Sequence, residues 1–268
     1  MRVLISNDDG INAPGIAFLA KVMRTVAQEV YVVAPASNQS AVSHSLSIRK
    51  DMLLKRVYFP AEVTEAYSLE GTPADCVKVG LNWVLRDKKP DFVITGMNNG
   101  YNAGFDTRYS GTIAGAIEGL YHGIPSIAVS AGRTVFGYRE TDFPDIQAGP
   151  ALTESRAGMN YGVSLPLEVV AEVLKEVMAE RQLPDQLWNV NFPGCKKEDI
   201  SGIYRTCLDS HSFFLDEYGG TRISDEETSI RLMDVLNDSP EEGSDIWSLN
   251  QNMISVTPIS IAVLKNRL

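Results

Sequence analysis

The sequence predicts an α/β fold built on a mostly parallel sheet. Short apolar runs at 3–5, 30–34 and 91–95 each end at turn residues, a pattern typical of strands that are buried on both faces. An amphipathic helical pattern over 16–28 separates the first two runs. A strand, a helix and a second strand in so short a span indicate a right-handed parallel crossover.

The other elements follow in order along the chain. Strands are expected at 45–50, 52–59, 66–69, 126–130, 187–192 and 203–207, and as a pair around Pro258 within 254–261. Helices are expected at 73–86, 111–121 and 166–182. The stretch 131–164 shows little periodicity, so we expect an irregular excursion near the site or at a subunit contact.

The chain is expected to form one domain, 1–268. Its 268 residues are 44% hydrophobic and 22% charged, which is enough apolar mass for one sizeable core. No internal repeat or linker divides it, so the core should comprise roughly 1–208 and 251–268. Residues 209–250 combine aromatic side chains with an acidic tract, which favours a projecting β-hairpin arm.

Charge and composition limit the classes of partner that the chain is expected to bind. The net charge of −10 argues against a nucleic-acid polymer or an anionic membrane as partner, because neither would attract this surface. Small anionic substrates stay open, because a bound divalent cation reverses the local charge. We expect no signal peptide and no membrane span. Cys76, Cys195 and Cys207 show no metal-like spacing, so reduced thiols in a cytoplasmic protein are expected.

Two adjacent acids, Asp8 and Asp9, directly follow the first predicted strand. Ligands of open α/β sheets bind outside the carboxyl ends of the strands, where this pair lies. Two neighbouring carboxylates repel each other unless a cation neutralises them, and hard oxygen ligands suit Mg²⁺, Mn²⁺ or Ca²⁺. The pair is equally compatible with a plain turn or helix cap, with Gly10 and Gly15 as turn glycines.

Two further oxygen donors follow two other predicted strands. Ser40 lies in the polar loop after 30–34, and Asn98 lies in the glycine- and asparagine-rich loop after 91–95. Each residue alone is more typical of a turn. Because parallel strands end at the same edge of a sheet, these oxygens could meet Asp8 and Asp9 around one hard cation.

Residues Ser110, Gly111 and Thr112 begin a predicted helix. A helix N-terminus with a glycine and two hydroxyls can bind an anion through free N–H groups, although Ser110 could also be an ordinary N-cap. A hard cation beside an anion site suggests a phosphoryl substrate. The chain has no Walker pattern and no G-x-G-x-x-G between a strand and a helix, which argues against those nucleotide-binding classes.

The three histidines indicate functional roles less clearly than the acidic pair does. His44 could act as a general base, but a loop histidine is more often structural or solvated. His122 lies at the end of the helix that Ser110 begins, where a positive charge suits the helix dipole. His211 allows no assignment.

Five ordered motifs closely resemble the SurE survival-protein family. They are SNDDGINAPG (6–15), VVAPASNQSAVSHSLSI (32–48), GTPADCV (71–77), TGMNNGYNAG (95–104) and YSGTIAGAIEG (109–119). The resemblance resumes weakly at NVNFPG (189–194) and SVTP (255–258). The chain departs from the family pattern at Ala36 and Ser37, at Asn99 and Tyr101, and over 105–108, which bears on substrate preference more than on metal binding.

The resemblance implies a fold, an activity and a set of site residues. The fold would be a Rossmann-like three-layer α/β/α domain whose C-terminal arm is used in oligomerisation, as a homodimer or a homotetramer. The activity would be that of a 5'-nucleotidase that needs one divalent ion per subunit, Mg²⁺ or Mn²⁺, with 3'-nucleotidase and exopolyphosphatase activity also open. Metal ligands would be Asp8, Asp9, Ser40 and Asn98. The phosphate would lie against Asn98, Ser110, Gly111 and Thr112.

The leading hypothesis is hydrolysis of a nucleoside monophosphate by a metal-activated water, with Asp8 and Asp9 as catalytic residues. One alternative makes Asp8 a covalent nucleophile, but aspartyl-phosphate enzymes separate their two acids by one residue, whereas these are adjacent. The alternative from another class is a non-enzymatic, metal-dependent nucleotide-binding protein.

Overall fold

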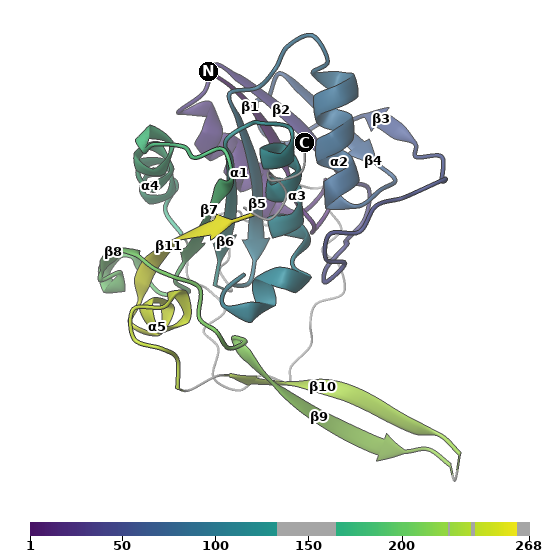
Figure 1. Cartoon of the computed structure of the whole chain (residues 1–268). Coiled ribbons are helices and arrows are strands. Elements are labelled where there is room, and N and C mark those ends of the chain that lie inside the picture. Colours follow the sequence, from purple (N-terminus) through teal and green to yellow (C-terminus); the bar gives the residue numbers. More distant parts are fainter. Residues whose placement is uncertain (133–164, 225, 237–238, 262–268) are drawn as a thin grey trace.

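A nine-stranded, mostly parallel sheet forms the centre of the computed structural model, which describes residues 1–132, 165–224, 226–236 and 239–261 (Figure 1). The strand order is β3-β4-β2-β1-β5-β6-β7-β11-β8. The bounds are β1 (Arg2–Ser6), β2 (Glu29–Pro35), β3 (Leu54–Arg56), β4 (Glu65–Leu69), β5 (Phe92–Asn99), β6 (Ser126–Ala131), β7 (Gln186–Phe192), β8 (Gly202–Arg205) and β11 (Met253–Ser260). Only the β3–β4 and β7–β11 pairs are antiparallel among these strands.

Helices cover both faces of the sheet, so the expected three-layer α/β/α architecture is confirmed (Figure 1). The helices are α1 (Pro14–Arg24), α2 (Pro73–Val79), α3 (Gly111–Tyr121) and α4 (Leu167–Ala179). Val3 and Ile5 of β1 pack with α1 and α4, whereas Leu4 points to the opposite face and packs with α2. The alternation explains why β1 needs an unbroken apolar run.

Local sequence signals set the helix starts. Thr72 and Asp75 form a capping box at α2, with Pro73 in the first turn. Ser110 caps α3, since its hydroxyl accepts a hydrogen bond from the N–H of Ile113 at 3.1 Å. The helix expected over 16–28 ends earlier, at Arg24, and the Thr25 hydroxyl bonds back to the Val22 carbonyl.

A long antiparallel hairpin, β9 (Phe214–Arg222) and β10 (Thr228–Leu236), extends away from the body of the protein (Figure 1). A projecting arm was expected within 209–250. The same stretch also contains α5 (Asp245–Asn250), whose buried Ile246 and Leu249 pack with Ala103 of the core. The part of this stretch that projects is therefore the hairpin, while α5 lies against the body.

Two expected strand assignments are wrong. Residues 45–50 form no strand: the carbonyl of Ser45 and the N–H of Ser47 bond instead to side chains at the start of α2. Residues 254–260 form one continuous strand rather than a pair. Pro258 is tolerated there because it lies beyond Val256, the last residue of β11 that pairs with β8.

Four further expectations concern a helix, the stretch 131–164, a membrane span and the cysteines. The helix expected over 73–86 ends as α2 at Val79 and continues as a π-helical turn, Gly80–Val84. The irregular excursion expected at 131–164 falls almost entirely outside the described residues. None of the helices in the described part of the chain is long and apolar enough to cross a bilayer. All three cysteines are free, and Cys76 is buried.

Candidate active site

The acidic pair lies in a tight turn directly beyond β1. The side chain of Asn7 brackets this turn: its amide donates to the Gly10 carbonyl at 2.9 Å and its oxygen accepts the Gly10 N–H at 3.2 Å. Gly10 has a φ of 102°, and an added Cβ would lie 3.3 Å from the backbone of Ser37. Strand β1 and this turn therefore present Asp8 and Asp9 at the carboxyl edge of the sheet.

Asp8 is held by the first turn of α3. The Thr112 hydroxyl donates to Oδ1 of Asp8 at 2.6 Å, and the Thr112 N–H also bonds to this carboxylate. A Cβ at Gly111 would lie 2.9 Å from the Asp8 Cβ, so glycine allows the close approach. Burial raises the pKa of Asp8, and the hydrogen bonds from Thr112 oppose that rise. Within this helix start, Thr112 therefore binds the protein's own carboxylate.

The environment of Asp9 also raises the pKa of its carboxyl group. Burial, followed by the charge of Asp8, raises the pKa of Asp9 to about 7, although the N–H of Asn99 bonds to its carboxylate. Within the described residues, no lysine, arginine or histidine forms an ion pair with Asp8 or Asp9. Two adjacent carboxylates without a cationic partner, one buried and one partly buried, are a donor set that a hard divalent cation fits.

The loops after β2 and β5 meet the same edge. The Gln39 N–H donates to the Asp8 carbonyl at 2.7 Å, which joins the Ser40 loop to the acidic turn. Ser40 itself is exposed, and its N–H bonds to the Asn38 side chain at 2.8 Å. Asn98 is half-buried and donates to the Gly100 carbonyl at 2.9 Å. The structure thus brings together the segments that carry the four predicted metal ligands.

The path of β5 toward this edge depends on one glycine. The pairing of β5 with β6 shifts register between Thr95 and Asn98. Gly96 lies within this irregularity with a φ of 132°, and a Cβ there would lie 2.1 Å from the Val129 carbonyl oxygen. The Thr95–Gly96 sequence is therefore part of what directs Asn98 and Asn99 to the acidic pair.

A buried asparagine network behind the site is absent from the sequence predictions. The Asn102 carbonyl accepts hydrogen bonds from Asn189 at 2.7 Å and from Asn191 at 3.0 Å. The Asn102 side chain donates to the Ser130 hydroxyl at 2.9 Å. These contacts hold the loop after β5 against β6 and β7. The signal that could have revealed them is the pair of asparagines in 189–194, which interrupts an otherwise apolar strand.

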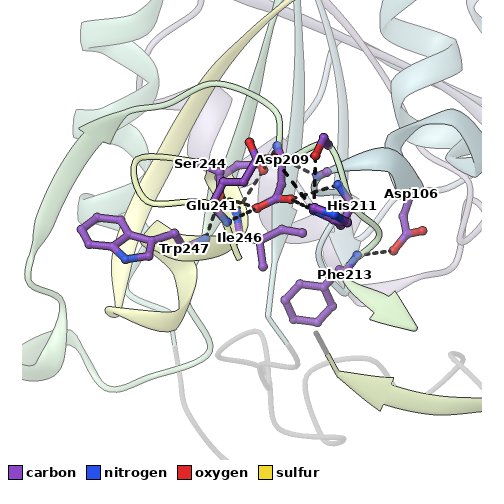
Figure 2. A network of polar contacts seen from close by, with 11 residues as sticks. Asp106, Asp209, His211, Phe213, Glu241, Ser244, Ile246 and Trp247 are labelled. Atoms are coloured by element: carbon purple, nitrogen blue, oxygen red, sulfur yellow. Dashed lines mark hydrogen bonds and ion pairs between the residues drawn. The ribbon is translucent and has the colours of Figure 1, made fainter. Parts of the chain in front are cut away.

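A second polar cluster, Asp209, His211 and Glu241, lies at the base of the hairpin (Figure 2). Its potential ligand atoms lie within 4.8 Å of one another. However, Oδ1 of Asp209 already accepts bonds from the N–H and the ring of His211, and Oδ2 accepts bonds from the Glu241 N–H and the Ser244 hydroxyl. Asp209 therefore acts as a structural anchor for the segments on both sides of the hairpin.

Known proteins match this chain over most of its length. The sequence model of the family described as "Survival protein SurE" matches residues 3–213. The chain belongs to the SurE family. A relative named 5'-nucleotidase SurE from Alkaliphilus metalliredigens is 34% identical over 262 residues, which cover 97% of this chain and 92% of that protein. Another of the same name from Clostridium beijerinckii is 36% identical, with coverage of 97% and 92%.

Solved structures agree with the family assignment. The crystal structure of the SurE protein from Aquifex aeolicus is similar to this chain with a TM-score of 0.77 and 32% identity, and the match covers 99% of this chain and 95% of that one. The resemblance and the Rossmann-like α/β fold predicted from the sequence are therefore confirmed.

Proposed function

We propose that this SurE-family chain is a divalent-metal-dependent nucleotidase that hydrolyses nucleoside monophosphates to nucleoside and phosphate. The observation that carries the proposal is the acidic pair Asp8 and Asp9, which has no positively charged partner among the described residues and lies at the carboxyl edge of a parallel sheet. The relatives named 5'-nucleotidase SurE support the same activity. A cytoplasmic location is part of the proposal.

The cation would be held by Asp8, Asp9, Ser40 and Asn98, with one Mg²⁺ or Mn²⁺ per subunit. Two carboxylates, a hydroxyl and an amide oxygen form an all-oxygen donor set, which matches the preference of such ions. A bound divalent ion would polarise a phosphoryl oxygen and lower the pKa of a bound water.

The chain's own residues would orient the attacking water and bind the phosphoryl group. Thr112 orients Asp8, and the Asp9 carboxylate would orient the attacking water or accept its proton. Ser110 uses a hydroxyl lone pair for its cap, which leaves the hydroxyl proton available to a phosphate oxygen. Together with the Gly111 N–H and the Asn98 side chain, the Ser110 hydroxyl would stabilise charge on the phosphoryl group. Thr112 would act on the phosphate through Asp8.

Oligomeric assembly belongs to the same proposal. The exposed fractions of Tyr218, Ile223 and Ile230, which lie in or beside the β9–β10 hairpin, are 64%, 67% and 68%. Apolar side chains on a projecting element are typical of a surface that contacts another chain. We therefore propose a homodimer joined through this arm, with a homotetramer as the larger alternative.

The activity is tested by release of inorganic phosphate from a panel of 5'- and 3'-nucleoside monophosphates and polyphosphate. Turnover of 5'-monophosphates should require Mg²⁺ or Mn²⁺ and disappear in excess chelator. The 3'-monophosphates and polyphosphate show whether the site also has 3'-nucleotidase or exopolyphosphatase activity. Metal-dependent nucleotide binding without phosphate release would favour the non-enzymatic alternative, and a trapped acyl-phosphate would favour Asp8 as a nucleophile. Undiminished turnover in chelator would contradict metal dependence.

Metal binding should depend on pH because Asp9 must lose its proton. Below pH 7 the raised pKa keeps Asp9 protonated in the metal-free protein, so Mn²⁺ affinity should fall by about tenfold per pH unit. Calorimetry at pH 6 in buffers of different ionisation enthalpy should detect release of about one proton per Mn²⁺. An affinity that is unchanged between pH 6 and pH 8 would contradict the role of Asp9.

A further inference from the structure

A buried carboxylate on α3, that of Glu118, lies beside two histidines and one lysine. Glu118 is 5% exposed. Its Oε1 lies 2.8 Å from Nε2 of His44, and its Oε2 lies 3.3 Å from Nζ of Lys78 and 3.9 Å from Nδ1 of His122. Burial alone would raise the pKa of Glu118, but the bonds from His44 and Lys78 outweigh it and lower the pKa, so the carboxylate is ionised at neutral pH.

His44 belongs to the segment that carries Ser40. Residues 36–50 contain no helix or strand. Ala41 and Ser43 have φ values of 56° and 53°, a backbone conformation that residues with a Cβ rarely adopt. Such a path persists only where surrounding contacts impose it. Tertiary contacts, rather than local propensity, must therefore hold this segment in place.

The segment is attached at points on both sides of Ser40. Before it, the Gln39 N–H bonds to the Asp8 carbonyl at 2.7 Å. After it, the Ser43 N–H bonds to the Tyr109 carbonyl at 3.0 Å, directly before α3 begins. His44 then reaches Glu118, and its ring bonds to the ionised carboxylate. The same helix thus holds Asp8 through its first turn and the Ser40 segment through Glu118.

We propose that His44 is a positioning residue, which holds Ser40 at the cation site by pairing with Glu118. The inference rests on the proposed function, in which Ser40 is a metal ligand. It assigns His44 no contact with substrate and no proton transfer. Loss of the pair should leave the acidic turn intact but allow the Ser40 segment to move, so the cation should lose one of its ligands for part of the time.

The test is Mn²⁺ binding to the full-length metal-free protein, measured by calorimetry at pH 7. His44→Ala should weaken Mn²⁺ binding about five- to tenfold, whereas His44→Gln, which keeps a donor for Glu118, should recover most of the affinity. His122→Ala is the matched control: it removes an imidazole near the same carboxylate but does not touch the segment, so it should stay within about twofold of wild type. At saturating Mn²⁺, His44→Ala should keep a near-wild-type kcat.

Two further measurements separate positioning from other effects. Amide hydrogen exchange over 37–46 should rise in His44→Ala and not in His122→Ala. Glu118→Gln should weaken Mn²⁺ binding, and the double variant should be no weaker than His44→Ala alone, because the two residues act as one unit. If His44 acted only through a positive charge at long range, its removal would tighten Mn²⁺ binding instead, and that result would overturn the inference.

The outcomes for this inference and for the proposed function are distinguishable. Wild-type-like Mn²⁺ affinity in His44→Ala, with intact Mn²⁺ binding and nucleotidase activity in the wild type, overturns the positioning role alone. Failure of the wild-type protein to bind Mn²⁺ overturns both.

Discussion

Replacing Asp9 by asparagine is expected to lower kcat about 10²- to 10³-fold and, at the same time, to make the metal-free protein more stable at pH 8. The pKa of Asp9 is raised to about 7 in the folded protein, above its value in the unfolded chain. The free energy of unfolding therefore falls as pH rises between these two values, because the folded state resists losing the proton. Asparagine removes the charge and can still accept the bond from the Asn99 N–H.

The gain in unfolding free energy of Asp9→Asn at pH 8 should be about 2 kcal/mol. This is less than the full pKa shift of Asp9 implies, because Asp9 is only partly buried. It is measured by denaturant unfolding in excess chelator, and kcat is measured at saturating Mn²⁺. Asp87→Asn, at an exposed position, makes the same change of charge and should alter neither quantity. A fully active Asp9→Asn, or one less stable than wild type, would contradict the assignment of Asp9.

Replacing Asp209 by alanine is expected to cost about 3 kcal/mol of unfolding free energy. The carboxylate is buried at the base of the hairpin, and its loss would leave the Glu241 N–H and the Ser244 hydroxyl without their acceptor (Figure 2). Burial alone would raise the pKa of Asp209, but these bonds and those from His211 lower it. The stabilisation is therefore present above the pKa of the unfolded chain and lost as pH falls through the lower pKa of the folded protein.

Urea unfolding at pH 7 and at pH 3 measures this effect, and the difference between wild type and Asp209→Ala should shrink at the lower pH. His211→Ala serves as the control, since 62% of that side chain is exposed and its removal leaves Asp209 with its backbone and hydroxyl donors. An equal loss in both variants would mean that the ring of His211, rather than the Asp209 carboxylate, stabilises the hairpin base.

The central strands could be predicted because the signal for them lies in consecutive residues of the sequence. A parallel strand that is buried on both faces needs an apolar residue at every position, and β1, β2, β5 and β6 all have such runs. The meeting of the loops after β1, β2 and β5 follows from topology alone, since parallel strands end at one edge. The placement of Asp8, Asp9 and the Ser40 and Asn98 segments could therefore be predicted from the sequence.

The details that could not be predicted depend on partners distant in sequence. Thr112 bonds to Asp8 across 104 residues and His44 meets Glu118 across 74, so neither pairing leaves a local pattern. The run at 45–50 alternates polar and apolar residues as a strand would, yet its backbone bonds to the start of α2. In both situations tertiary contacts decide between options that local propensity leaves nearly equal in energy.

The position of β1 between β2 and β5 has a consequence for biosynthesis. The contacts that Asp8 and Asp9 make with Gln39, Asn99 and Thr112 all join residues that precede the end of α3 at Tyr121. A nascent chain can therefore close this edge while the ribosome is still translating the second half of the message. The β9–β10 hairpin, α5 and β11 follow later in the chain, so they are synthesised after the residues that form these contacts.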